Sequence, residues 1–434
     1  MKRLCSHLDR TNEQGVVITL VAVFMLFVVG AMAVLAIDVV TFYTARSEAQ
    51  LAADAAALAG ARVLANSGMT SSTLATNPSL APAAATLCVT VAKQVANSNS
   101  VGGQTPGTVT VTCNTTTSQN NPTATVRVQS NIPTFFARIW GTTQITVAAS
   151  ATAEAYNPQG LTAPSPVATT CVKPWLLPNL DPSGGAPTLF DTTTGAIQDY
   201  NLLNGLSVGS PLQEDCNRGN CTPGGLGAAA AWKFVPGETT TTFQPPPAGS
   251  VTCSPAVGGF SSTAYELAIA GCVQAPIACN AQVYVDLSNY PTRNSETARG
   301  VNCLAHTELN GGDTVDLTNN TPPPFEFLPG DDNPLVQSGA LSTSQDVFVS
   351  DSIVTVPVFD QTASGWPPVN PVQVVGFVQL FLSPTGLQTP QFGPNRGHVT
   401  TTIINMVGCG TGATGTPTII GNGPSAVPVR LITQ

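Results

Sequence analysis

At 434 residues the chain exceeds the usual size of one hydrophobic core, so at least two domains are expected. Only 9% of the residues are charged, while Gly (39) and Pro (36) are abundant and scattered without the period that would indicate collagen. The net charge of −9 argues against nucleic acid as a partner, since phosphate binding requires clustered Lys and Arg.

An uncharged apolar segment occupies residues 15–37. As a helix it would extend about 34 Å, which is enough to cross a hydrocarbon core of about 30 Å. Lys2, Arg3 and Arg10 precede it. The positive-inside rule therefore predicts a single-pass transmembrane anchor, with residues 1–14 as a cytoplasmic tail and the rest of the chain outside.

A cleavable signal peptide is the alternative to this anchor. Residues 16–29 have the length of a signal-peptide apolar core, and residues 31–33 (Ala-Met-Ala) fit the small-x-small cleavage pattern. Apolarity nevertheless continues through Ile37 and stops only at Asp38, which lengthens the segment to a full span. The retained anchor is therefore favoured.

Residues 38–66 are rich in Ala, contain no Pro and end near Gly68, which predicts a long helix that continues the anchor as a single stalk. At 100° per residue, five small side chains form one narrow stripe, consisting of Ala45, Ala49, Ala52, Ala56 and Gly60. Small residues allow close approach of a second backbone, so the stripe is a candidate interaction surface for a partner helix. Packing on the protein's own first domain is the other interpretation.

Residues 67–156 have the pattern of a small α+β unit. A helix is predicted over residues 81–96, with Pro82 in its first turn, and strands over 108–113, 124–129 and 143–153. Residues 157–170 carry three prolines and no charge, which is typical of a linker.

Residues 171–434 are predicted to form an extracytoplasmic β-rich domain. Strand-like runs occur at 282–287, 346–359, 372–382, 398–407 and 427–433, separated by stretches rich in turn residues. The expected fold class is therefore α+β: a single N-terminal transmembrane helix continuing into a long helix, a small α+β unit, and a mainly β, disulfide-bearing domain.

Ten of the eleven cysteines follow the apolar segment, and only Cys5 precedes it. An even number on one side favours disulfides in an oxidising compartment. Cys88 and Cys113 are natural partners within the small unit, and Cys216 and Cys221 flank a short turn that a local disulfide could close. No Cys-x-x-Cys pair is present, so zinc is not expected.

The sequence contains few features that indicate catalysis. His306 lacks an accompanying nucleophile elbow, and Asp331 and Asp332, with Asp313 upstream, lack the alternating spacing of a calcium loop. Phosphate-binding and dinucleotide motifs are also missing. We therefore predict no catalytic residues, no metal ligands, no cofactor and no enzymatic activity.

Two blocks of sequence resemble the Tad (tight adherence) Flp pilus-assembly family, the TadE/TadG-like proteins. The first comprises Glu13-Gln14-Gly15, residues 36–39 (AIDV), 43–46 (YTAR) and 51–61 (LAADAAALAGA). The second comprises residues 126–128 (VRV), 132–141 (IPTFFARIWG), 145–147 (ITV) and 149–154 (ASATAE). The resemblance covers roughly residues 13–155.

This resemblance implies a membrane-anchored structural or assembly component of a Tad (Flp-type) pilus or a related envelope secretion system. Its expected location is the bacterial inner membrane, with the N-terminus cytoplasmic and the body periplasmic or extracellular. The expected partners are the membrane and other pilus-assembly or envelope proteins. The alternatives are a surface-exposed adhesin released by signal cleavage, and an envelope enzyme that uses His306 or the acidic loop.

Overall fold

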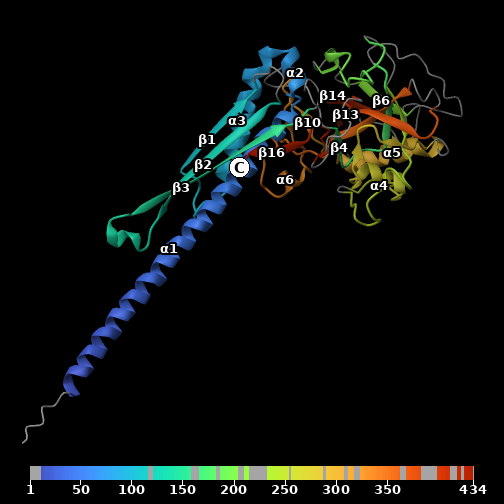
Figure 1. Cartoon of the computed structure of the whole chain (residues 1–434). Coiled ribbons are helices and arrows are strands. Elements are labelled where there is room, and N and C mark those ends of the chain that lie inside the picture. The colour runs from blue at the N-terminus through green and yellow to red at the C-terminus, as the bar shows by residue number, and fades with distance from the viewer. Residues whose placement is uncertain are drawn as a thin grey trace, which may run out of the picture.

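The computed structural model describes residues 11–115, 121–157, 166–181, 186–203, 210–214, 232–253, 256–286, 290–306, 311–316, 323–361, 368–382, 398–410, 418–421 and 425–433. These residues form one long N-terminal helix, a small unit of helices and a four-stranded sheet, and a mainly β body (Figure 1). The predicted α+β fold class is confirmed.

Helix α1 (Thr11–Asn66) runs without interruption for 56 residues and projects from the rest of the molecule as a straight rod (Figure 1). The apolar segment and the Ala-rich segment are therefore one stalk, as predicted. The helix ends before Gly68, whose φ of +78° lies in the left-handed region that favours glycine. The N–H of Met69 donates to the carbonyl of Leu64 at 2.9 Å, the six-to-one bond of a Schellman motif.

Short helices follow the stalk, and the longest of them packs back on it. They are α2 (Ser71–Thr76), η1 (Pro78–Leu80) and α3 (Ala81–Ser98), with Pro82 in the first turn of α3 as predicted. Helix α3 buries Ala84, Cys88, Ala92 and Ala96, which recur every four residues and so lie on one face. This face packs against α1.

The small unit is completed by an antiparallel sheet in the order β1–β2–β3–β16. Its strands are β1 (Thr108–Asn114), β2 (Thr123–Pro133), β3 (Gln144–Ala155) and β16 (Val429–Thr433), with the turn η2 (Ala137–Trp140) between β2 and β3. Val429 pairs with Ala155. Residues 429–433 thus belong to the sheet of the small unit, although the sequence suggested that they form part of the body.

The stripe of small residues on α1 faces this sheet and α3. Ala49, Ala52 and Ala56 have no exposed surface, and Ala45 and Gly60 are also buried. A Cβ atom placed on Gly60 would lie 2.9 Å from Cβ of Ala124 and 3.2 Å from Sγ of Cys88. The stripe therefore packs inside the protein's own domain, which supports the internal interpretation rather than the partner-helix hypothesis.

The end of α1 is held by the body. The side chain of Asn66 donates to the carbonyl of Phe348 at 2.6 Å, and Asn405 donates to the carbonyl of Ala65 at 3.3 Å. The N–H of Phe325 donates to the carbonyl of Ser67 at 3.0 Å. Because these partners come from several parts of the body, the stalk and the body are joined without a free linker at this point.

The body contains a seven-stranded mixed sheet in the order β12–β5–β7–β6–β14–β13–β9. Strand β12 also pairs with β13, so six of the strands close into a ring. The strands are β5 (Trp175–Pro178), β6 (Ser210–Glu214), β7 (Trp232–Pro236), β9 (Gln282–Val283), β12 (Ile353–Phe359), β13 (Val372–Leu382) and β14 (His398–Gly408). A core that includes Trp175, Phe234, Val356 and Leu380 packs between these strands.

Smaller elements surround the ring. The remaining strands are β4 (Val167–Thr169), β8 (Ile277–Ala278), β10 (Thr314–Val315), β11 (Phe327–Leu328) and β15 (Ile419–Ile420). The helices are η3 (Tyr200–Leu203), α4 (Ala264–Ala270), α5 (Tyr290–Leu304) and α6 (Pro334–Gln337). The sequence analysis did not predict these helices.

The predicted strands of the body agree with the structure to different degrees. Strand β13 has the predicted bounds, and β14 and β16 lie close to theirs. The run at 346–359 is a strand only from Ile353, and the run at 282–287 only at Gln282–Val283. Strand propensity alone does not supply a pairing partner, and these runs are strands only where a neighbour bonds to them.

Four disulfides lie among the described residues. Cys88 and Cys113, the pair expected from the sequence, join α3 to β1. The other three connect distant segments of the body and are Cys171–Cys272, Cys253–Cys303 and Cys279–Cys409. Cys216 and Cys221 lie outside the described residues, so their local pairing stays a prediction.

Replacing Ala52 with Leu tests the internal packing of the stripe. We expect lower thermal stability and lower abundance of the protein, because overpacking a closed contact typically costs about 1–3 kcal/mol. The measurement is thermal unfolding of the detergent-solubilised protein. Ser47→Leu, which places the same side chain on an exposed position of the same helix, serves as the matched control. Equal stability of the two variants would contradict the packing.

A non-reduced peptide map tests the disulfides. We expect peptides that link Cys171 to Cys272, Cys253 to Cys303 and Cys279 to Cys409. The same map tests the predicted Cys216–Cys221 link. A link between Cys272 and Cys279, which are close in sequence, would contradict the arrangement of the body.

Candidate functional site

The apolar segment of α1 is exposed along its whole length, with exposed fractions such as 66% for Val16 and 74% for Leu26. Thr19, the only hydroxyl-bearing residue within residues 15–37, donates to the carbonyl of Gly15 at 2.8 Å, so this polar group is satisfied within the helix. A helix surrounded by apolar side chains with internally paired polar groups suits a lipid environment.

Two helices of the described chain are long and apolar enough to cross a membrane. The stretch Gly15–Asn66 reaches a mean hydropathy of 3.0 over its most apolar 18 residues, none of them buried. Pro78–Ser98 reaches 1.2, and 22% of its most apolar window is buried. The second helix packs on α1 and is bonded to β1 through Cys88, so it belongs to the folded small unit.

Asp38 follows the apolar segment directly and connects it to the sheet. One carboxylate oxygen accepts the N–H of Phe135 at 2.9 Å, and the other accepts the N–H groups of Phe136 and Ala137 at 3.0 Å each. These amides open the turn η2, where a helix start has no internal acceptors for its N–H groups. The far end of the β2–β3 hairpin is thereby fixed to α1, and we call this set of contacts the Asp38 clasp.

The Asp38 side chain is almost completely enclosed, at 3% exposure for the residue. Burial acts to raise the pKa of Asp38, but the three backbone hydrogen bonds outweigh it and lower the pKa below its ordinary value. A lowered pKa in the folded state means that the clasp is stabilising at neutral pH. This stabilisation is lost only as the pH falls through the pKa of the folded state.

The sequence analysis did not assign a role to Asp38 beyond ending the apolar segment. The sequence signal that could have indicated the clasp was the presence of two blocks that resemble the Tad family, residues 36–39 and 132–141. The fold brings these two blocks together. The remaining predicted site residues have been placed above: the stripe is buried, Cys88 bonds to Cys113, and Cys216 and Cys221 lie outside the described residues.

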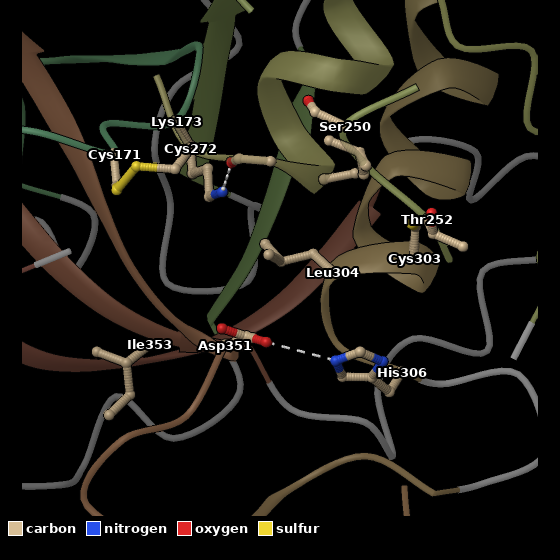
Figure 2. Close-up of a pocket in the computed structure, with 13 residues that line it drawn as sticks. Cys171, Lys173, Ser250, Thr252, Cys272, Cys303, Leu304, His306, Asp351 and Ile353 are labelled. Atoms are coloured by element: carbon tan, nitrogen blue, oxygen red, sulfur yellow. Dashed lines mark hydrogen bonds and ion pairs between the residues drawn. A yellow bond between two sulfur atoms is a disulfide. The ribbon is translucent and has the colours of Figure 1, made fainter. Parts of the chain in front are cut away.

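The body contains a pocket of roughly 370 Å³, shown in Figure 2. The Cys171–Cys272 disulfide and Lys173 lie at one side, and His306 and Asp351 at the other, with Leu304 extending between them in this view. Catalytic and binding sites usually lie in pockets that contain a few charged groups.

Lys173 is buried, and its ammonium donates to the carbonyls of Ile269 and Gly271 at 2.6 Å each. These carbonyls lie at the C-terminal end of α4, where a helix lacks internal donors and favours a cation. Burial lowers the pKa of Lys173 to about 7, although the nearby charge of Asp351 acts to raise it. The amine is thus engaged in holding α4 on the sheet, and its contacts give it a structural role.

His306 and Asp351 form a pair with Nε2 and Oδ2 at 3.4 Å, and the Asp351 side chain is exposed. His306 has a φ of 53°, which is uncommon for a residue with a side chain and reflects its place at the turn after α5. Lys173 is held by two carbonyls at the end of α4, and His306 is paired with Asp351, so these side chains of the pocket are engaged with the protein itself. The geometry therefore assigns no reaction to His306.

The acidic residues named in the sequence analysis lie in different surroundings. Asp313 accepts hydrogen bonds from the N–H of Gly330, the amide of Asn333 and the hydroxyl of Ser350, so it ties two loops together. Burial raises the pKa of Asp332, a shift that nearby His306 opposes. Asp313 thus has a structural role in holding these loops together.

A different group of carboxylates comes together near β10 and β11. Asp316, Glu326 and Asp346 each place one oxygen within 4.8 Å of the others. Burial and mutual repulsion raise the pKa values of Glu326 and Asp346. Acidic groups of this kind are common at protein surfaces without an ion, and we assign no metal to this group.

Replacing Asp38 with Asn tests the clasp. The amide removes the charge and one acceptor oxygen, so the N–H groups of residues 135–137 should exchange with solvent faster, by roughly tenfold or more given the usual strength of hydrogen bonds to a charged acceptor. Hydrogen–deuterium exchange with mass spectrometry measures this. Asp54→Asn is the control, because Asp54 bonds to Gln50 on the same helix. Unchanged exchange at residues 135–137 in Asp38→Asn would contradict the clasp.

Comparison with known proteins places the N-terminal part of the chain. The model of the Tad family, described as Flp pilus-assembly TadE/G-like, matches residues 15–63. This match covers the apolar segment, Asp38 and the whole of the stripe. No curated protein matches the chain, and no solved structure matches it. Residues 15–63 are therefore similar to the TadE/G-like family, and this similarity supports a Tad-type N-terminal domain.

Proposed function

We propose that the protein is a membrane-anchored structural or assembly component of a Tad (Flp-type) pilus or a related envelope secretion system. The family to which its N-terminal domain is matched is a pilus-assembly family, structural rather than enzymatic. The single observation that supports the proposal most is the continuity of α1, which leaves the apolar segment exposed at one end and enters the folded protein at the other.

The second half of α1 has the properties of a rigid spacer. Residues 38–66 span about 44 Å at 1.5 Å per residue. Over this length α1 contacts β2, β3, β16 and α3, and its last residues are bonded to the body. Such a spacer would hold the body at a fixed height above the membrane, where it would meet other pilus-assembly or envelope proteins.

The proposed location is the bacterial inner membrane, crossed once, with residues 1–14 in the cytoplasm and the body in the periplasm or outside the cell. Two features support this orientation. The basic residues Lys2, Arg3 and Arg10 precede the apolar segment. The described disulfides all follow the apolar segment, and disulfides persist in an oxidising compartment such as the periplasm.

A secreted or surface-exposed binding module, released by cleavage after residues 31–33, remains the alternative function. The structure places these residues within the uninterrupted α1. If the N-terminal segment is not cleaved, the exposed apolar part of α1 stays joined to the part that packs against the sheet and α3. The proposal therefore favours the anchor.

Sequencing the N-terminus of the mature protein from membrane and soluble fractions tests the proposal. We expect the start before residue 15 to be retained, and the protein to leave the membrane only with detergent. A mature chain that begins just after Ala33 and is found in the soluble fraction would contradict the anchor and favour the adhesin.

Co-purification from membranes then tests the assembly role. Full-length protein should bring down other components of the same pilus system, and a variant with Leu26→Arg in the apolar segment should show weaker membrane association and recover fewer of these partners. An anchored protein that brings down none of them would contradict the assembly role while leaving the anchor intact.

A further inference from the structure

The end of the β2–β3 hairpin exposes large apolar side chains to solvent. We call residues 135–145 the hairpin tip. Phe135 and Ile139 are exposed by 71% and 74%, and Ile145 is also exposed. Folded proteins normally bury such residues, and a group of them on a small projecting element marks a contact surface.

The hairpin tip is an ordered element rather than a loose loop. The N–H of Ile139 donates to the carbonyl of Phe136 at 2.9 Å, and the N–H of Thr142 donates to the carbonyl of Ala137 at 3.0 Å. Gly141 takes the left-handed conformation that the tight turn requires, with a φ of 88°. Together with the Asp38 clasp, these bonds hold Phe135 and Ile139 outward in a fixed arrangement.

The clasp also fixes where the hairpin tip lies. Asp38 is the residue that follows the apolar segment, so the tip is tied to the end of the predicted membrane span (Figure 1). In Figure 1 the hairpin runs beside α1 and its tip points back toward the apolar end of the helix, while the body lies on the other side. The exposed surface of α1 continues past the clasp through Val40 and Tyr43.

The composition of this region suits the boundary between lipid chains and headgroups. Tyr43 is an exposed aromatic residue of the kind enriched at that boundary. Arg138 and Arg46 are exposed close to it, where a guanidinium can bind headgroup phosphates. Apolar side chains on an amphipathic element at this depth insert beneath the headgroups.

We propose that the hairpin tip is a second membrane contact, in which Phe135 and Ile139 insert into the outer leaflet of the bilayer that α1 crosses. Two contacts beside each other would prevent α1 from tilting freely and would set the direction in which the body faces. This inference rests on the proposed anchoring by α1. Lipid is favoured over a protein partner because the Asp38 clasp ties the exposed apolar residues of the tip to the end of the apolar segment.

Photo-cross-linking of the full-length protein in vesicles tests the contact. Benzoyl-phenylalanine is introduced at position 139 in protein reconstituted into phosphatidylethanolamine and phosphatidylglycerol. Peptides are then analysed for attached lipid. Position 29, in the middle of the apolar segment, reports on anchoring. Position 349 is the matched control, since Val349 is exposed by 65% and lies in a cavity wall with Ala59 and Arg62 of α1.

Ala59 lies 21 residues beyond Asp38, which is about 32 Å further along the helix. We therefore expect lipid adducts at positions 29 and 139 and about tenfold less at position 349, because residues at the boundary insert only about 5–10 Å into the bilayer. Intact Cys88–Cys113 in the peptide map verifies that each variant is folded.

The outcomes separate the two proposals. Adducts at position 29 without adducts at position 139 would overturn the hairpin-tip contact and leave the anchor intact. A lack of adducts at both positions would overturn the anchor itself. Cross-links from position 139 to protein instead of lipid would identify the tip as a protein-binding surface and would also overturn the proposal.

Discussion

The packing of the small-residue face of α1 against its sheet and α3 is the contact on which the rest of the structure depends. Helix α1 has to be apolar on every side over residues 15–37 and small on one side from Ala45 onward. The small face lets β2 and α3 come so close that Gly60 has no room for a Cβ atom. Because one continuous helix meets both requirements, an orientation imposed at the apolar end is carried into the body without a hinge.

Asp38 marks the change from one environment to the other. Its charge ends the apolar segment, and its two oxygens are used for N–H groups that the η2 turn would otherwise leave without acceptors. The same residue therefore satisfies a backbone requirement of the hairpin and sets the position of the hairpin along the helix. The body, by contrast, is stabilised by disulfides between distant segments and by a ring of strands.

The sequence predicted the elements whose signals are local. The long helix, α3 with Pro82, and strands β1, β2 and β3 follow from composition and from alternation along the chain. Contacts between distant residues could not be obtained in this way. The helix α4 was missed although Thr263 and Glu266 form a capping box, because its seven residues are too few to show a clear helical period. The Asp38 clasp required knowledge that residues 36–39 and 132–141 meet, and the long-range disulfides of the body required the fold.

The pairing of β16 with β3 has a consequence for the order of folding. The edge of β3 stays open until residues 429–433 arrive, and the whole of the body lies between the two strands. In the proposed orientation, the sheet that packs on α1 can be completed only after the whole body has been exported. A chain that stops short would display the unpaired edge of β3, a template for aggregation and a mark by which proteases can recognise incomplete molecules. Pairing of the last strand thus distinguishes a complete molecule from a truncated one.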